Sequence, residues 1–427
     1  MRNKQHAIWV GTVLALLTTI FLLGQVSPKA RRAENIALIN GQWFGGNSFE
    51  SKPMYSSNGL FISTKPARID RTIDLKNRWI VPPFADAHSH SFGMGIPGAN
   101  AKAAGAYQEA GVFYVQSQGN LPMTEAEKAA ILLNSPEGID VTLSNATVTS
   151  HNSALHAFFA SMILPRGIFP GYSLETLNGV RYFEIDNNEE LKRKWPLMMD
   201  QKDDFIKAYL WLTDNAPFVG PPALAGQHAL SPEVFRSIVS QAHAVGLHVS
   251  AHIVSAGDFK LAIEGGADEI AHMPSIGIIT PEVAKMAARN NVPVVTTMAQ
   301  VGAAPENIPI PMREAAAAML IVTTTNLKIM AANGVSIIIG ADNPADTSST
   351  EASFIRSLGI FDNAAMLRMW GTATPQAIFR DRKIGELKDG YEASFLALDA
   401  DPLKDWSATE KIQMRFKQGS LMAAVPQ

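Results

Sequence analysis

The sequence predicts an α/β fold: a (β/α)8 TIM-like barrel with a small β-sandwich domain built from both termini. In the middle of the chain, about eight strand-like runs alternate with helix-like segments over roughly 300 residues, as a parallel barrel requires. Short β-like pieces with turn signals flank this region on both sides. A doubly wound open sheet is the alternative, but no glycine-rich phosphate-binding fingerprint follows an early strand.

The first 30 residues are predicted to be a targeting segment. "MRNKQH" carries positive charge, and the run Ala7–Pro28 that follows contains no charged residue. Its apolar core is slightly longer than that of most signal peptides and near the lower limit of a membrane span. We therefore expect an exported protein, periplasmic or secreted, with residues 1–30 acting as a signal peptide or as an N-terminal membrane anchor.

The two ends of the remaining chain are expected to meet in one domain. "NIALINGQWFGG", "GLFISTK" and "ARIDRTIDLK" follow the targeting segment, and "GELKDGYEASFLALDADPL" and "KIQMRFKQGSLM" lie near the C-terminus. We expect residues 33–78 and 385–427 to form the composite β-sandwich, and residues 79–384 to form the barrel.

Within the barrel, strand-like runs such as "WIVPPF", "VFYVQSQ", "HVSAHIV" and "SIIIGAD" are separated by helix-like segments. Ser231 and Thr280 each precede a proline and a glutamate, which is typical of a helix N-cap followed by the first helical turn. The region therefore shows both the strands and the helix starts that a βα-repeat needs.

The composition of the chain excludes some classes of binding partner and of chemistry. The 427 residues carry a formal net charge of −3, which argues against a nucleic-acid-binding protein. The chain has no cysteine, which excludes disulfides, a cysteine nucleophile and cysteine metal ligands. A small-molecule substrate is the expected partner, and a homo-oligomer is left open.

Histidines mark the end of the first predicted barrel strand, in "FADAHSHSFG". Residues i and i+2 of an extended chain point the same way, so His88 and His90 can reach one metal ion. Asp86 lies on the same face and could orient one of the two imidazoles from behind.

Three further ligand-type residues close later strand-like runs. His252 ends "GLHVSAH", His272 ends "GADEIAH" and Asp342 ends "SIIIGAD". Active-site groups of a (β/α)8 barrel lie at the C-terminal ends of its strands, so these side chains should meet His88 and His90.

Lys207 lies inside the apolar run "DFIKAYL". Burial disfavours its ammonium form, and a neutral amine can add carbon dioxide to give a carbamate that bridges two cations. The alternative is an amine that extends outward or pairs with Asp203 or Asp204.

The ordered motifs "DAHSH", "FIKAY", "VSAH", "EIAH" and "GAD" resemble those of the amidohydrolase superfamily, with "GTATPQAIFRDRKIGELKDGYEASFLAL" similar to its closing segment. The resemblance spans Ile36 to Met422. It is greatest to the imidazolonepropionase-like and Xaa-Pro dipeptidase-like binuclear branch.

The resemblance implies two divalent metal ions, zinc first and manganese, cobalt or iron as alternatives. The implied ligands are His88, His90, Lys207, His252, His272 and Asp342. His88, His90 and Asp342 would hold the more buried ion and His252 and His272 the more exposed one. Carboxylated Lys207 would bridge the two ions, and Asp342 would act as general base and then general acid.

The implied activity is hydrolysis of an amide-type C–N bond of a peptide, N-acyl amino acid or cyclic amide. A lactone, ester or organophosphate hydrolase and an inactive metal-stabilised binding protein are the alternatives. Deamination is disfavoured because Ser255 stands where deaminases of the superfamily carry a glutamate. His151, Tyr114 and Tyr209 are candidate substrate contacts.

Overall fold

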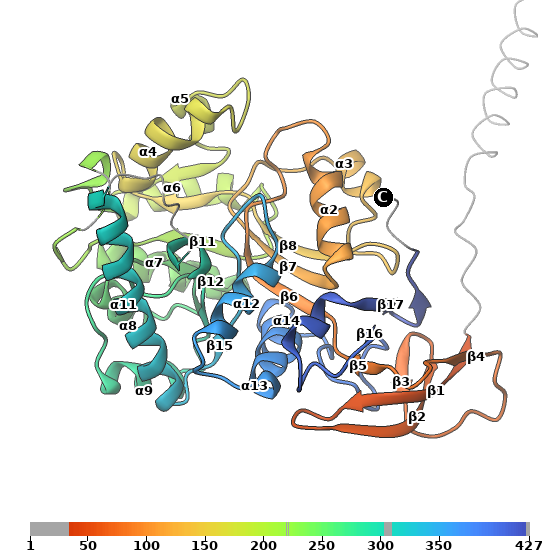
Figure 1. Cartoon of the computed structure of the whole chain (residues 1–427). Helices are drawn as coiled ribbons and strands as arrows, with labels where there is room; N and C mark the ends of the chain where they lie inside the picture. Colours follow the sequence, from red (N-terminus) through yellow and green to blue (C-terminus); the bar gives the residue numbers. More distant parts are fainter. Residues whose placement is uncertain (1–33, 219, 221, 303–309, 424–427) are drawn as a thin grey trace, which may run out of the picture.

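The computed structural model describes residues 34–218, 220, 222–302 and 310–423, so the predicted targeting segment lies outside the described residues. The described chain is an α/β protein. A mostly antiparallel sheet from both ends of the chain adjoins parallel strands from the middle (Figure 1).

The two chain ends share one eight-stranded sheet, in the order β18-β17-β16-β5-β1-β2-β3, with β4 paired to β1. Its ladders are antiparallel, except that β1 runs parallel to β4 and β5. Leu396 pairs with Val81, which joins the C-terminal strands to the N-terminal ones. The strands are β1 (Asn35–Phe44), β2 (Phe49–Ser57), β3 (Leu60–Ile62), β4 (Arg71–Asp74), β5 (Trp79–Val81), β16 (Phe395–Leu398), β17 (Ile412–Lys417) and β18 (Ser420–Leu421).

The middle of the chain forms a three-stranded parallel sheet, β6-β7-β8, and a seven-stranded one, β10-β9-β11-β12-β13-β14-β15. Both edge strands of the smaller sheet form a hydrogen bond to a residue that adjoins a strand of the larger one. Ala87 N donates to Ile339 O at 2.9 Å, and Asp204 N donates to Leu143 O at 2.8 Å. The strands are β6 (Phe84–Ser89), β7 (Val112–Gln118), β8 (Asp140–Ser144), β9 (Thr147–Thr149), β10 (Tyr182–Glu184), β11 (Ile206–Tyr209), β12 (Val249–His252), β13 (Glu269–Ile270), β14 (Val294–Val295) and β15 (Ile337–Ile338).

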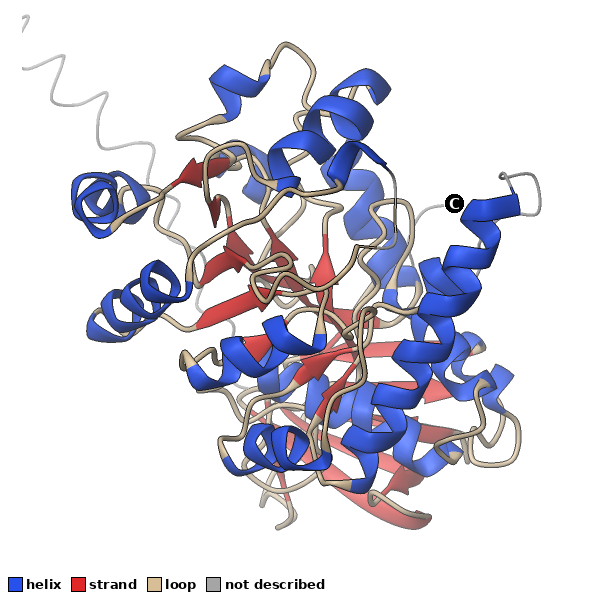
Figure 2. Ribbon diagram, turned by 90° about the vertical axis from the view of Figure 1, so that its left-hand side faces the viewer, coloured by secondary structure: helices blue, strands red, loops and turns tan. Residues whose placement is uncertain are grey.

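Helices surround the parallel strands (Figure 2). The α-helices are α2 (Ala99–Glu109), α3 (Glu125–Ala130), α4 (Ala154–Phe158), α5 (Leu174–Leu177), α6 (Asn188–Met199), α7 (Pro232–Ala244), α8 (Ala256–Glu264), α9 (Pro281–Arg289), α10 (Ala299–Gly302), α11 (Ile310–Ala332), α12 (Ser348–Ser357), α13 (Asn363–Arg368) and α14 (Thr374–Ile378). The π-helices are η1 (Phe159–Ile163) and η4 (Met369–Ala373), and the 3₁₀ turns are η2 (Leu164–Arg166), η3 (Pro222–Leu224) and η5 (Trp406–Glu410).

The predicted N-caps are confirmed. The Ser231 side chain accepts from Val234 N at the start of α7, and the Thr280 side chain accepts from Val283 N at the start of α9. Helix α11 is long and apolar enough to cross a membrane by length and composition. Its Asn326 donates to Pro274 O, which ties the helix to the loop after β13.

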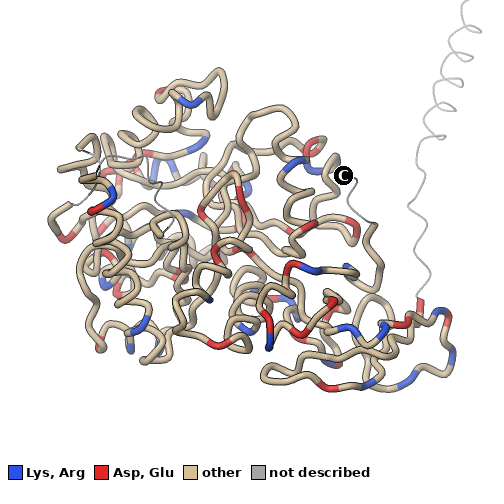
Figure 3. The backbone as a smooth tube through the Cα atoms, viewed as in Figure 1, with Lys and Arg blue, Asp and Glu red and all other residues tan. Residues whose placement is uncertain are grey.

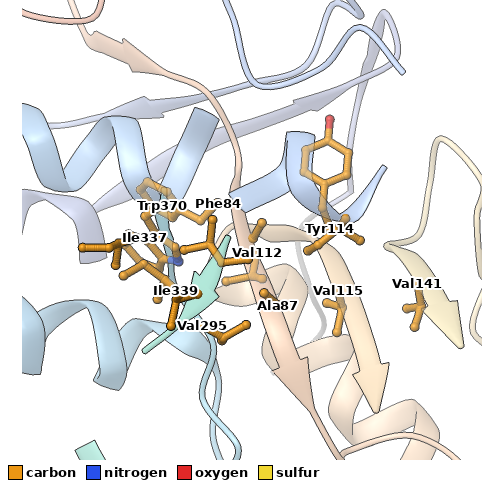
Figure 4. Packing of buried hydrophobic residues seen from close by; sticks show 14 of the residues in the cluster. Phe84, Ala87, Val112, Tyr114, Val115, Val141, Val295, Ile337, Ile339 and Trp370 are labelled. Carbon is orange, nitrogen blue, oxygen red and sulfur yellow. The ribbon is translucent and has the colours of Figure 1, made fainter. Parts of the chain in front are cut away.

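The core lies between the parallel strands and the helices around them. Every residue of β6 and β7 is buried, as expected for parallel strands covered on both faces. Phe84 of β6 stacks on Trp370 with ring centroids 3.6 Å apart (Figure 4). Charges of both signs are spread over the described chain, in agreement with its near-neutral balance (Figure 3).

The segment between β9 and β11 differs most from the expected pattern. It contains α4, α5, α6 and the extra parallel strand β10, in place of the single helix of a regular βα-repeat. With the loop after β11 it forms a second apolar cluster, which includes Phe159, Phe169, Tyr182, Tyr209 and Trp211. The three residues of β10 were too short a run to signal a strand.

Candidate metal centre

His88 and His90 project together from the end of β6, as the period of an extended chain predicts. Their Nε2 atoms lie 3.3 Å apart. His88 is 1% exposed, and its Nδ1 lies 2.9 Å from Ala271 O, which leaves Nε2 directed at His90. Asp86 does not orient either imidazole. Its Oδ1 accepts from the main-chain N–H groups of His88 and Ala341, each at 3.0 Å, so it fixes the backbone at this strand end.

Asp342 brings a carboxylate to the two histidines. Its Oδ1 lies 3.3 Å from both His88 Nε2 and His90 Nε2. The residue adopts a left-handed backbone, φ 53°, and its N–H donates to His88 O at 2.7 Å. Aspartate tolerates this conformation better than most residues. Ligand atoms of these three residues all lie within 4.8 Å of one another, which makes them a candidate cation site.

His252, at the end of β12, and His272, just after β13, extend the cluster. The His272 ring centroid lies 4.4 Å from those of both His88 and His252. His272 Nδ1 is 3.7 Å from Asp342 Oδ2. The His252 Nε2 atom is buried and has no hydrogen-bond partner among the described residues. A buried polar atom without a partner is unusual, and a metal ion would satisfy it.

The buried histidines are held in the neutral form. Burial lowers the pKa of His88, His252 and His272 well below the usual value, and the nearby Lys207 charge lowers each of these pKa values further. Neutral imidazole is the form that binds metal. For Asp342, burial alone would raise the pKa, but the His90 hydrogen bond and the nearby positive charges bring the pKa below its usual value. The cluster therefore offers neutral nitrogens and an ionised carboxylate.

Lys207 of β11 is buried, only 3% exposed, and its Nζ donates to Gln118 Oε1 at 2.5 Å. Burial lowers the Lys207 pKa to about 7, against the opposing effects of Asp342 and Glu269. The outward-pointing alternative does not hold in this structure. The carboxylates of Asp203 and Asp204 accept from the main-chain N–H groups of Asn145 and Leu143. The Lys207 amine instead contacts Gln118.

A buried polar network beneath the cluster was missed from the sequence. Glu269 Oε1 accepts from Gln116 Nε2 at 2.6 Å and Ser250 Oγ at 2.7 Å, and Gln118 Nε2 donates to Ala87 O at 2.8 Å. Burial raises the pKa of Glu269. The available signal was polar side chains inside apolar strands, since buried polar groups need partners. The network fixes Gln118, which in turn contacts Lys207.

The three candidate substrate contacts lie in different places. The Tyr209 ring stacks on His252 at 3.9 Å between centroids, beside the cluster. Tyr114 lies four residues before Gln118 on β7, and its hydroxyl donates to Glu392 Oε1 at 3.0 Å. The structure therefore does not bring Tyr114 to the histidines.

His151 forms a separate group with acidic residues. Its Nδ1 lies 2.9 Å from Asp186 Oδ2 and 3.9 Å from Glu190 Oε2. These three residues are a second set of metal-type ligand atoms within 4.8 Å. Their carboxylates also cap local backbone N–H groups: Asp186 Oδ1 accepts from His151 N, and Glu190 Oε2 accepts from Asp186 N.

Ser255 has a structural role. Its side chain accepts from Asp258 N as the N-cap of α8, and its hydroxyl donates to Asp214 Oδ1 at 2.9 Å. Ser255 therefore serves as the N-cap of a helix.

The fold and the candidate metal centre at its strand ends are those of a hydrolase class. The chain belongs to the amidohydrolase family, whose family model matches residues 133–422, more than half of the sequence. The matched range includes Lys207, His252, His272 and Asp342, whereas His88 and His90 precede it. The protein is therefore an enzyme of this family.

Solved structures share the fold. A prolidase complexed with N-methylphosphonate-L-proline is 18% identical, with a TM-score of 0.71 over 91% of this chain and 99% of that one. The A. niger ochratoxinase is 18% identical, with a TM-score of 0.72 over 91% and 95% of the two chains. A Xaa-Pro dipeptidase with bound methionine is 16% identical, with a TM-score of 0.72 over 91% and 99%. These agree with the predicted branch, and a comparison with curated protein sequences found no match.

Proposed function

We propose that the enzyme hydrolyses an amide-type C–N bond of a small substrate, such as a peptide, an N-acyl amino acid or a cyclic amide, with a metal-activated water. The observation that carries the proposal is the convergence of His88, His90 and Asp342 within 4.8 Å at the ends of two parallel strands. His252 and His272 lie beside them.

The residues present fit two divalent ions. His88, His90 and Asp342 would hold one, and His272 and the unpartnered Nε2 of His252 would hold the other. Lys207, carboxylated on Nζ, would bridge the two. This nitrogen and oxygen donor set suits zinc, and manganese, cobalt and iron can use the same donors.

Bound divalent ions would supply Lewis acidity for the scissile carbonyl and acidify the attacking water. Asp342 is ionised and reaches into the cluster, so its carboxylate would accept the proton of the attacking water. It would then donate that proton to the leaving nitrogen. The Tyr209 ring, stacked on His252, would hold that imidazole in its orientation.

We also infer that the two parallel sheets form one closed (β/α)8 barrel, residues 79–384. The hydrogen bonds at both edges of the three-stranded sheet support this arrangement. Residues 33–78 and 385–427 would form the composite β domain. The uncharged run after "MRNKQH" supports export, with residues 1–30 as signal peptide or anchor.

The test is Asp342→Asn in metal-loaded protein, assayed on N-acyl amino acids, Xaa-Pro dipeptides, cyclic amides and lactones. We expect kcat to fall by roughly 100- to 10,000-fold, the usual contribution of general acid–base catalysis. Most of the metal should stay, because the histidines are unchanged. Asp362→Asn is the matched control, since asparagine caps a helix as well as aspartate does at this N-cap of α13.

Metal content tests the site separately. Mass spectrometry of the wild type should find close to two ions per chain, and Lys207→Ala should lower that number. One ion per chain, unaffected by Lys207→Ala, would refute the binuclear site. Hydrolysis of lactones with no amide turnover would refute the bond assignment.

A further inference from the structure

Arg181 is a buried cation for which the proposed chemistry has no use. It is 5% exposed and precedes β10. Its Nη1 donates to Thr147 Oγ1 at 3.1 Å, and its Nε is buried without a hydrogen-bond partner. Among the described residues, no carboxylate lies within ion-pair distance of the guanidinium. Buried charges are normally paired, so this one calls for an explanation.

Arg382 provides the internal comparison. It also lies over aromatic rings, Tyr114 and Phe379, yet it pairs with Asp140 Oδ2 at 2.8 Å and Glu392 Oε2 at 2.6 Å. Those carboxylates raise the Arg382 pKa despite burial, whereas burial lowers the pKa of Arg181 to about 9. Arg181 therefore lies against aromatic rings as Arg382 does, but no described carboxylate pairs with it.

Through Thr147, the guanidinium lies near Lys207, one of the proposed metal ligands. Thr147 is opposite Lys207 in the β9–β11 ladder, and these two side chains share one face of the sheet. A Cβ on Gly119 would lie 2.6 Å from Arg181 Nη1, so the chain leaves room there that only glycine allows. Gly119 directly follows Gln118, which contacts Lys207.

A cluster of buried apolar side chains lies beside both Arg181 and the histidines. Arg181 lies 5.1 Å from the Phe159 ring centroid and 5.7 Å from that of Phe169. Both phenylalanines belong to the second apolar cluster, which also contains Tyr209, the ring stacked on His252. A substrate group that contacts both this cluster and the guanidinium would need an apolar part next to an anionic end.

We propose that Arg181 binds a carboxylate of the substrate, so that the enzyme acts on amides with a free carboxylate next to an apolar group, such as N-acyl derivatives of apolar amino acids. This inference rests on the proposed amide hydrolysis. A guanidinium binds a carboxylate through two parallel charge-assisted hydrogen bonds, which would satisfy the unpartnered side of Arg181.

Binding is tested by calorimetry on metal-loaded protein, with 3-phenylpropionate and its uncharged isostere 4-phenylbutan-2-one. Wild type should bind the carboxylate more tightly, and Arg181→Met should reduce that preference by roughly 10- to 100-fold, the value of a charged hydrogen bond. Arg181→Lys, which keeps the charge without the fork, should lose less. Arg382→Met should keep the preference. An unchanged preference in Arg181→Met would overturn the proposal.

Hydrolysis provides the second test, with N-acetyl-L-phenylalanine and N-(2-phenylethyl)acetamide, which lacks only the carboxylate. The ratio of kcat/KM values should favour the acid in wild type, and Arg181→Met should abolish this preference, mainly through KM. Carboxylate binding that depends on Arg181 without any hydrolysis would refute the proposed function alone. Hydrolysis of both amides at equal rates would refute this inference alone.

Thermal unfolding separates a binding role from a structural one. Arg181→Met removes an unpaired buried charge, so its Tm should equal or exceed that of wild type. Arg382→Met leaves two carboxylates without their partner and should lower the Tm. A Tm loss in Arg181→Met as large as that in Arg382→Met would indicate a structural cation and overturn the proposal.

Discussion

Lys417→Met should destabilise the fold strongly, because this lysine is buried in a hydrogen-bonded site between strand β17 and the start of β8. Its side chain is 0% exposed, and Nζ donates to Asp140 Oδ1 at 2.6 Å. Nζ also donates to Ser135 O at 2.7 Å and Gly138 O at 2.9 Å. Asp140 begins β8, so one ammonium links β17 of the mostly antiparallel sheet to a strand of a parallel sheet.

The expected cost follows from what the substitution leaves behind. Removing one partner of a buried ion pair costs about 3–5 kcal/mol, since the other charge loses its counter-ion. Arg382 Nη1 still donates to Asp140 Oδ2 at 2.8 Å. Because Asp140 keeps this counter-ion, we expect the lost ion pair to cost about 3 kcal/mol, the low end of that range. Two main-chain carbonyls also lose a donor, at about 1 kcal/mol each. We expect a loss of about 5 kcal/mol in the free energy of unfolding.

Urea unfolding of wild type, Lys417→Met, Asp140→Asn and the double variant measures this. The double variant should lose less than the sum of the single losses, because each single change strands a buried charge. Lys404→Met is the control: its lysine is 84% exposed and should change stability by less than about 0.5 kcal/mol. A Lys417→Met loss below about 1 kcal/mol, or strictly additive losses, would refute the reasoning.

Two further predictions concern the metal centre and pH. Gly340→Ala should lower the metal content, because a Cβ there would lie 2.8 Å from both His88 Cβ and His88 N; wild-type metal content in this variant would contradict the close packing. Burial raises the Glu351 pKa from 4.5 to about 7, so the folded state keeps a proton that the unfolded state releases. Stability should therefore fall as the pH rises from about 4.5 to 7, and Glu351→Gln should flatten that dependence in urea unfolding at pH 5 and 7.5. An identical pH dependence in the variant would contradict the assignment.

The sequence predicted that His88, His90, His252, His272 and Asp342 would lie together because local rules applied to each of them. The period of an extended strand placed His88 and His90 on one face, and their Nε2 atoms indeed lie 3.3 Å apart. His252 and Asp342 could be assigned because each ends a recognisable apolar run. Parallel strands bring their C-terminal ends to one edge, so residues far apart in sequence were expected to meet.

The partners of these residues could not be predicted in the same way. Gln118 is 89 positions from Lys207, and Glu269 is 151 positions from Gln118. No local pattern relates such pairs, because their contact depends on strand register. Tyr114 shows a related difficulty. It shares a face of β7 with Gln118, but it lies four residues earlier along the strand, where its hydroxyl contacts Glu392.

Charge balance connects the proposed metal centre to the proposed carboxylate site. Carboxylation would change Lys207 from a buried cation to an anion, so the positive charge that lowers the pKa values of His88, His252 and His272 would be removed. Asp342 and the carbamate would still offset only part of the charge of two divalent ions, and Arg181 adds a further positive charge that no described carboxylate pairs with. Burial magnifies this imbalance, since charges interact more strongly away from water. An anionic substrate would neutralise part of the positive charge that the described residues do not offset.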